Sequence, residues 1–149
     1  MTPSSTRARV GLALAALLAA CGPRSPRVVL GPLAGGLDAF VAAHPLAPGQ
    51  DFRADEVGRT TSASYHLVQV RGHERPHRHL AHDLTVLVMR GKGTLTLGAE
   101  RIDLAAGDAA VIRRGEVHWF SNGGRGPALT LAVFAPPLDA PDSVPADDR

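Results

Sequence analysis

Short apolar segments, separated at regular intervals by turn residues, constrain the fold of this chain more than any other feature. They occupy residues 65–70, 84–89, 94–97, 101–104, 108–112, 117–121 and 129–134. Alternating or continuous apolar residues over such short stretches are typical of β-strands. Gly98 and Gly115 mark turns between neighbouring segments, and 16 glycines and 12 prolines in 149 residues favour many more. The pattern predicts an all-β sandwich or small barrel.

The stretches on either side of this β region have a different composition. Residues 22–37 carry three prolines and four glycines, which is typical of a tether. A short helix is predicted for 37–43, ended by Pro45, whereas the polar stretch 47–60 predicts no definite element. From Pro136 to the end, four prolines and four aspartates predict a tail that frays in solvent.

The N-terminus has the layout of a bacterial export signal. Arg7 and Arg9 precede an unbroken run of small apolar residues, 10–20, which ends at Cys21. This run is much shorter than the roughly 20 residues that a membrane-spanning helix needs. Residues 18–21, Leu-Ala-Ala-Cys, resemble the lipobox of bacterial lipoprotein precursors. That resemblance implies cleavage before Cys21 and lipidation of its thiol, and the alternative is an ordinary cleaved signal followed by a chance cysteine.

These features predict four parts: an export signal at 1–20, a lipidated cysteine with tether and short helix at 21–50, a barrel at 51–136, and a flexible acidic tail at 137–149. The mature chain would be anchored in the cell envelope, on the periplasmic side. Gly22 after the cysteine is not the acidic residue of an inner-membrane retention signal, which favours the outer membrane. Loss of Arg7 and Arg9 leaves 14 basic and 14 acidic side chains, a balance that disfavours nucleic acid as a partner.

Histidines supply the candidate chemistry. Four of the seven fall between His73 and His82. His77 and His79 are two residues apart, so both rings point to the same face of an extended segment. Two imidazoles on one face, joined by a third donor from elsewhere in the chain, would form a metal site. A histidine pair alone is a weak indication, because polar loops also gather histidines by chance.

The later part of the chain supplies that third donor. The residues Gly107, Arg113, Gly115, His118 and Asn122 have the spacing G-x5-R-x-G-x2-H-x3-N. This resembles the second motif of the cupin family, with Arg113 where the family usually has proline. Gly72, His77, His79 and Gly91 resemble the first motif, and fifteen residues separate Gly91 from Gly107.

The resemblance covers roughly residues 60–135 and implies a small cupin-type β-barrel, also called a double-stranded β-helix or jelly roll, preceded here by one short helix. Carried over residue by residue, it implies that His77, His79 and His118 share one metal ion. The alternative for His118 is a histidine that packs beside Trp119 and Phe120. Small cupins often dimerise, so a homodimer is a further expectation from the family.

The fourth ligand departs from the family pattern. The family's acidic ligand falls on Leu84, and the neighbouring Asp83 would face the opposite side of a regular strand. A β-bulge could turn Asp83 inward, His82 could bind instead, or water could complete the site. Asp83 has the family's spacing from His79, so we expect the set His77, His79, Asp83 and His118, with His82 as the alternative to Asp83.

Three imidazoles with one carboxylate suit Fe, Mn, Ni, Zn or Cu as a divalent ion, and the ligand types do not choose among them. Open coordination positions would permit a metal-dependent reaction on a small molecule, such as an oxygenation. The alternatives are a module that senses or holds a ligand without chemistry, and an envelope interaction domain with a vestigial site. His73, Glu74 and Arg75 are interpreted as a solvated loop, with lining of the mouth of the site as the alternative. His66 is interpreted as an inward-facing hydrogen-bond partner behind the ligands.

Overall fold

A computed structural model describes residues 27–30 and 33–146 of the protein. The predicted export signal, Cys21 and the last three residues of the chain lie outside the described residues. Within the described part, no helix has the length and hydropathy that crossing a bilayer requires.

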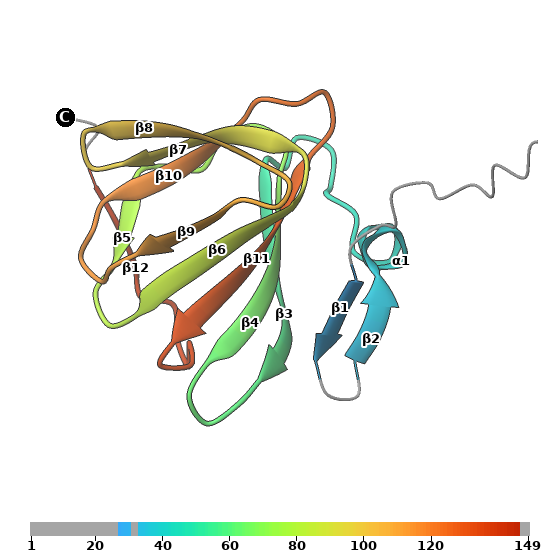
Figure 1. Cartoon of the computed structure of the whole chain (residues 1–149), viewed down its shortest axis with the longest axis horizontal. Helices are drawn as coiled ribbons and strands as arrows, with labels where there is room; N and C mark the ends of the chain where they lie inside the picture. Colours follow the sequence, from blue (N-terminus) through green and yellow to red (C-terminus); the bar gives the residue numbers. More distant parts are fainter. Residues whose placement is uncertain (1–26, 31–32, 147–149) are drawn as a thin grey trace, which may run out of the picture.

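The described residues form twelve strands and one short helix (Figure 1). In chain order they are β1 (Arg27–Leu30), β2 (Leu33–Gly36), α1 (Leu37–Ala43), β3 (Phe52–Arg59), β4 (Ser64–Val70), β5 (His77–His79), β6 (Asp83–Arg90), β7 (Lys92–Leu97), β8 (Glu100–Ala105), β9 (Ala109–Ile112), β10 (His118–Asn122), β11 (Ala128–Ala135) and β12 (Ser143–Pro145). The predicted helix and all seven predicted strands are confirmed, with strand ends shifted by one or two residues.

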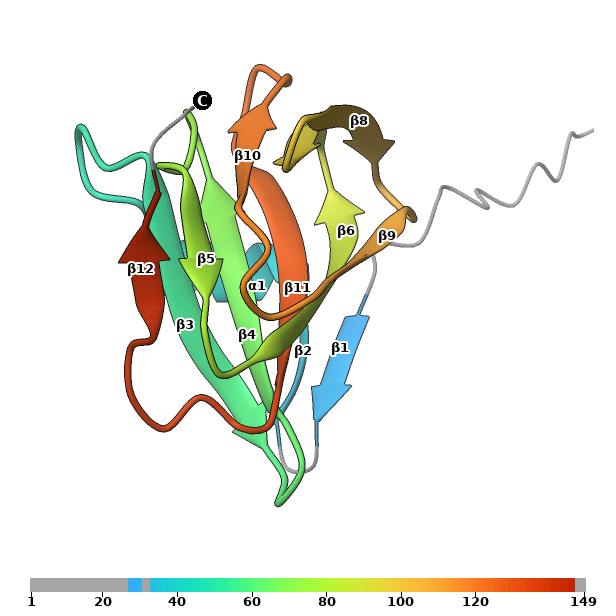
Figure 2. The same ribbon diagram turned by 90° about the vertical axis from the view of Figure 1, so that its left-hand side faces the viewer.

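Two five-stranded antiparallel sheets face each other and enclose the interior of a barrel (Figure 2). One has the order β12-β5-β10-β7-β8 and the other the order β3-β4-β11-β6-β9, while β1 and β2 form a separate hairpin. The predicted all-β barrel is therefore confirmed. The order also brings β5 and β10, which carry the two histidine motifs, next to each other in one sheet.

Alternation along β4 separates two apolar clusters. Val68 and Val70 point between the sheets into the main core, together with Leu84, Leu95 and Ile112. Leu67 points to the opposite face, where it packs with Leu37, Val57 and Leu129. Leu37 begins α1, so the helix covers the outer face of this sheet and leaves the barrel interior free.

Several strands appear where the sequence predicted none. β3 lies in the polar stretch 47–60 and pairs along β4. β12 lies in the stretch expected to fray, and its residues pair with β5 in the register Ser143↔His79 and Pro145↔His77. The expectation of a fraying tail is therefore wrong for this segment. The segment 143–145 has no alternation of apolar residues that would mark it as a strand, and its position depends on backbone pairing with β5. Pro145 is tolerated there because β12 is an edge strand.

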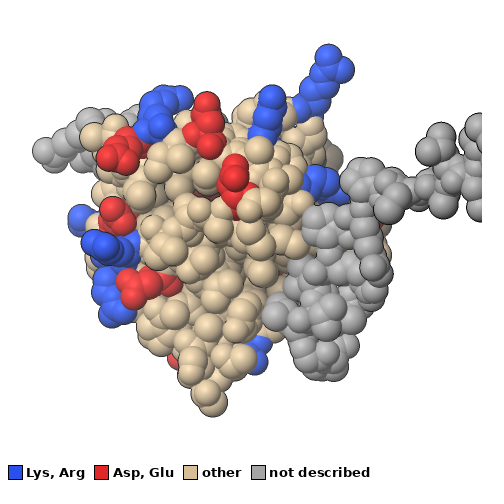
Figure 3. All heavy atoms as spheres, viewed as in Figure 1, with Lys and Arg blue, Asp and Glu red and all other residues tan. Residues whose placement is uncertain are grey.

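Charged side chains of both signs are interspersed on the face seen in Figure 3, and a broad uncharged area separates some of them. Several basic groups are paired with carboxylates nearby, among them Arg53 with Asp55 and Arg59 with both Glu56 and Asp139. The face seen in Figure 3 carries no broad region of one charge.

Candidate metal centre

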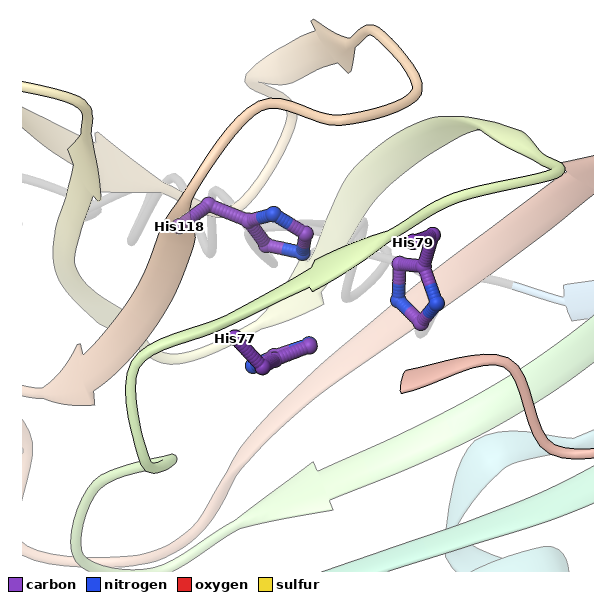
Figure 4. Close-up of side chains that lie close together, drawn as sticks. All are labelled: His77, His79 and His118. Carbon is purple, nitrogen blue, oxygen red and sulfur yellow. The ribbon is translucent and has the colours of Figure 1, made fainter. Parts of the chain in front are cut away.

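Adjacent strands of one sheet bring His77, His79 and His118 together (Figure 4). His77 and His118 lie directly opposite each other on β5 and β10. Each imidazole offers one nitrogen, and these three nitrogens lie within 4.8 Å of one another. The ring centroids are 4.4 Å apart for His77 and His118, and 5.4 Å apart for His79 and His118. The structure thus unites the three histidines that the two motifs single out.

The turn before β10 fixes the position of His118 relative to β5. Gly115 has a φ of +80°, a conformation that costs least in a residue without a Cβ. Its backbone N–H donates to the carbonyl of His79 at 2.6 Å. At the start of the turn, the Arg113 N–H donates to the Glu116 carboxylate at 3.0 Å. Proline, the family's usual residue at this position, has no backbone N–H and could not make this bond. Arg113 therefore adds a hydrogen bond that stabilises the turn.

The hydrogen bonds at Nδ1 determine which nitrogen of each ring is free. Nδ1 of His77 contacts the Arg75 carbonyl at 2.8 Å, and Nδ1 of His118 contacts the Glu116 carbonyl at 2.9 Å. Nδ1 of His79 contacts a carboxylate oxygen of Asp142 at 2.7 Å. These partners only accept, so we assign the ring hydrogen to Nδ1 and the free lone pair to Nε2 in all three rings.

His118 gives the sharpest indication of a ligand. Its side chain is 3% exposed, and its Nε2 is buried with no hydrogen-bond partner among the described residues. An unsatisfied buried acceptor is costly unless something uses its lone pair. Burial also lowers the pKa of His118 to about 4 and lowers that of His79. Both rings are therefore neutral near pH 7, which is the form that binds a metal ion.

Asp83 does not lie with the three histidines, contrary to the sequence prediction. Its carboxylate accepts hydrogen bonds from the backbone N–H and the guanidinium of Arg114, at 3.0 and 2.8 Å. The Arg114 side chain holds the pKa of Asp83 at about 2. Around Asp83 the pairing of β6 with β11 is regular, so no bulge turns this side chain inward. Regular alternation and the arginine partner together explain the difference.

His82 does not join the cluster either. Its Nδ1 contacts a carboxylate oxygen of Asp142 at 2.5 Å, and its Nε2 contacts the Pro137 carbonyl at 3.2 Å. Both ring nitrogens are therefore already engaged. Of the three arrangements that the sequence allowed, the one with three histidine ligands and no protein carboxylate agrees with the geometry.

A cavity of about 930 Å³ lies beside the imidazoles and is lined by all three of them. Its buried walls are mostly apolar and come from both sheets, including Val68, Val70, Leu84, Leu95, Ile112 and Phe134, with His66 and Thr130 as buried polar residues among them. Exposed polar residues, among them Asp51, His73 and Arg75, lie at its rim. The site therefore combines a group of nitrogen donors with an apolar chamber, an arrangement typical of small-molecule sites.

Glu74 and His66 also line the cavity. Glu74 was interpreted as part of a solvated loop, with the mouth of the site as the alternative, and the structure agrees with the alternative. Its carboxyl group accepts from the Phe120 N–H at 2.9 Å. Burial raises the pKa of Glu74, although nearby His77 opposes that shift. His66 is buried and faces the cavity as expected, but its Nε2 contacts Ser64 Oγ at 2.9 Å rather than a candidate ligand. No pattern in the sequence marks Glu74 as inward-facing, because its contact depends on a bridge to β10.

Comparison with known proteins shows the family of the barrel. Residues 64–134 match the family described as the cupin domain. An uncharacterised protein of Aquifex aeolicus (strain VF5) is 39% identical over 95 residues, which cover 64% of this chain and 78% of the relative. With its two histidine motifs on paired strands of a double-sheet barrel, the chain belongs to the cupin family.

Solved structures share the fold. TT1209 from Thermus thermophilus is 26% identical, with a TM-score of 0.58, and the match covers 66% of this chain and 94% of that one. A Klebsiella pneumoniae protein with a double-stranded β-helix domain is 23% identical, with a TM-score of 0.61, covering 72% of this chain and 95% of that one. The second likeness concerns the fold alone, and it identifies the barrel as a double-stranded β-helix.

Proposed function

We propose that this protein binds one divalent transition-metal ion through Nε2 of His77, His79 and His118, and that the ion acts on a small molecule held in the barrel. The observation that carries the proposal is the buried Nε2 of His118, which has no hydrogen-bond partner among the described residues. Three imidazoles, each with its Nε2 lone pair free, fit an ion of the Fe, Mn, Ni, Zn or Cu type. When bound, such an ion supplies Lewis-acid or redox chemistry.

The cavity supports a small amphipathic molecule as the ligand. Its buried apolar walls fit a hydrocarbon or ring portion, while the imidazoles and the Glu74 carboxyl group supply polar contacts in the same chamber. Three protein ligands leave coordination positions open for an oxygen or nitrogen atom of that molecule. The residues thus bind and orient the ligand, and the apolar walls exclude water from it.

A second function, ligand binding without chemistry, is favoured by one observation. The position of the family's acidic ligand is Leu84, which is 6% exposed and lines the cavity. Without that carboxylate the ion keeps a higher net charge, which suits tight retention of an anionic ligand. Substrate or O₂ consumption by the metal-loaded protein would support the enzyme, whereas tight ligand binding without any product would support the binding module.

Metal titration of the full-length, chelator-treated protein tests the site. We expect one equivalent of metal per chain by isothermal titration calorimetry and elemental analysis. His118→Ala should abolish binding, because it removes the buried donor. The matched control is His44→Ala, since His44 ends α1 and bonds to the Phe40 carbonyl, outside the cavity. A wild-type protein that takes up no transition metal would overturn the proposal.

We also propose that the protein is attached to the cell envelope by lipid at Cys21. The support is the sequence of residues 7–21, with its basic start, apolar run and Leu-Ala-Ala-Cys ending. Several acyl chains on one cysteine would give stable anchoring, whereas a single chain gives only marginal membrane binding.

A further inference from the structure

The end of the described chain forms an arm across the strand that carries two of the candidate ligands. We call residues 137–146 the C-terminal arm. Its strand β12 pairs with β5, and beyond it the Ala146 N–H donates to the Pro76 carbonyl at 3.0 Å. The arm therefore covers the outer edge of β5, and its residues Asp142, Ser143 and Pro145 also line the cavity.

Asp142 is the arm's point of contact with the site. One carboxylate oxygen lies 2.7 Å from Nδ1 of His79. The other lies 2.5 Å from Nδ1 of His82 and accepts the Ala81 N–H at 3.1 Å. The Asp142 side chain is 15% exposed and that of His79 is 9% exposed, so bulk water does not compete strongly for these bonds.

The geometry of these contacts shows which group supplies the hydrogen. The Ala81 N–H can only donate, so the Asp142 carboxylate acts as a hydrogen-bond acceptor towards its neighbours. An ionised carboxylate accepts and does not donate, so the hydrogen between it and His79 belongs to the ring. Nε2 of His79 is thereby left as the lone-pair nitrogen.

On the basis of the proposed function, we propose that Asp142 is a positioning residue for the metal site, which fixes the tautomer and the ring orientation of His79 through the C-terminal arm. Carboxylates that hold the distal nitrogen of a metal-binding histidine commonly contribute about 10- to 100-fold to metal affinity. The structure adds that His82 and the Ala81 N–H orient the carboxylate in turn. His82, which the sequence offered as an alternative metal ligand, thus instead contacts the carboxylate that holds His79.

The arrangement also couples the arm to the metal. Because Asp142 holds both the arm and His79, a metal ion that favours the ordered His79 ring also favours the docked arm. Such coupling is reciprocal by thermodynamic necessity. Metal binding should therefore slow hydrogen exchange at the amide of Ala146. Conversely, a substitution that makes the docked arm less stable should lower the affinity for the metal ion.

Substitutions in the full-length protein test the assignment. With Zn²⁺ as the probe, Asp142→Asn should weaken binding about 10-fold, and Asp142→Ala should weaken it further, up to about 100-fold. Asp142→Asn keeps one acceptor oxygen, so the graded order distinguishes positioning from simple loss of fold. The control is Asp139→Asn on the same arm, because Asp139 is exposed and pairs with Arg59. Equal Zn²⁺ affinity of wild type and Asp142→Ala would overturn the inference.

A spectroscopic readout in the metal-free protein separates this inference from the proposed function. Long-range ¹H–¹⁵N correlation spectra of the histidine rings report which nitrogen carries the hydrogen. We expect the Nδ1–H form for His79 in the wild type and a tautomer mixture in Asp142→Ala. The same tautomer in both proteins would contradict the role of Asp142. Failure of the wild type to bind Zn²⁺ would contradict the proposed metal function and leave this spectral test intact.

Discussion

At the scale of single residues, Leu84 distinguishes this site from the family pattern. It stands where the cupin motif has its acidic ligand, and the structure places its side chain on the cavity wall, 6% exposed. Its partners across the sheet are Ile112 on β9 and Phe134 on β11. The ring of Phe134 packs edge-on against His79, with centroids 5.0 Å apart. A carboxylate at position 84 would therefore enter the same chamber as the three imidazoles.

The substitution Leu84→Glu should tighten metal binding and destabilise the metal-free protein. The new carboxylate offers a fourth ligand, but without metal it is a buried carboxyl group with no partner, which takes up a proton rather than remain charged. We expect a loss of about 1–3 kcal/mol in the free energy of unfolding of the chelator-treated variant, measured by urea denaturation, and recovery on adding Zn²⁺.

Leu84→Gln is the matched control, because it introduces a buried polar group of the same length without the charge. It should be destabilised to a similar extent and should gain little metal affinity. A Leu84→Glu variant with wild-type affinity would show that position 84 does not reach the ion.

Asp83 and Arg114 give a prediction on pH dependence. The folded-state pKa of Asp83, about 2, lies below its ordinary value of 3.8. The pair's contribution to stability is therefore present above about pH 4 and is lost as the pH falls toward 2. Arg114→Gln should return the pKa of Asp83 toward 3.8, as measured by NMR titration of the carboxyl carbon.

Asp83→Asn should leave metal content unchanged, and reduced metal content would place Asp83 in the site after all.

At the scale of elements, the close approach of β7 and β10 sets the position of His118. Gly93 on β7 lies opposite Asn122 on β10. A Cβ at position 93 would lie 2.2 Å from the Ser121 carbonyl oxygen and 2.4 Å from the Phe120 ring. The absence of a side chain at this position therefore allows β10 to reach the register that places His118 opposite His77.

Gly93→Ala should accordingly lower both stability and metal affinity. Overpacking of this kind costs about 1–3 kcal/mol, and relief of the clash requires β10 to move, which displaces His118. Thermal unfolding and Zn²⁺ titration measure the two effects. Gly126→Ala is the control, because a Cβ there meets no atom within 4 Å. Wild-type behaviour of Gly93→Ala would show that β10 has more freedom than its packing indicates.

At the scale of the whole molecule, the barrel is one part of a chain that also carries a predicted membrane address. The proposed ligand site lies in the barrel interior, and the predicted anchor lies at Cys21, ahead of the β1–β2 hairpin and α1. Within the described residues, α1 packs on the outer face of one sheet, so this helix contacts the barrel away from its interior. The proposed ligand site and the proposed anchor are thus compatible in one molecule.

Cys21→Ser should release the protein from the membrane. In bacterial cells the wild type should sediment with membranes and enter detergent, and the variant should lose this behaviour because serine has no thiol for lipidation. Fractionation with immunoblotting measures the difference. A wild type recovered with the soluble envelope proteins would support the alternative of an ordinary cleaved signal.

Local patterns in the sequence were sufficient to predict seven of the strands and to single out the three histidines that cluster in the structure. Period-two alternation and turn residues act between neighbours in the chain, so they mark strands such as 65–70 and 129–134 without tertiary knowledge. The spacing of His77 and His79 puts both rings on one face, and the motif around His118 implied their partner. These inferences succeed because each rests on a few adjacent residues or on a recognisable spacing.

Tertiary structure alone decided what surrounds the histidines. Asp83 has the right spacing for a ligand but is held by Arg114, whereas Asp142 comes from a stretch that reads as a fraying tail and reaches His79. Glu74 enters the cavity through a backbone contact with β10. In each case the partner is distant in sequence, and its choice depends on strand pairing and burial, for which the sequence carries no local periodic signal.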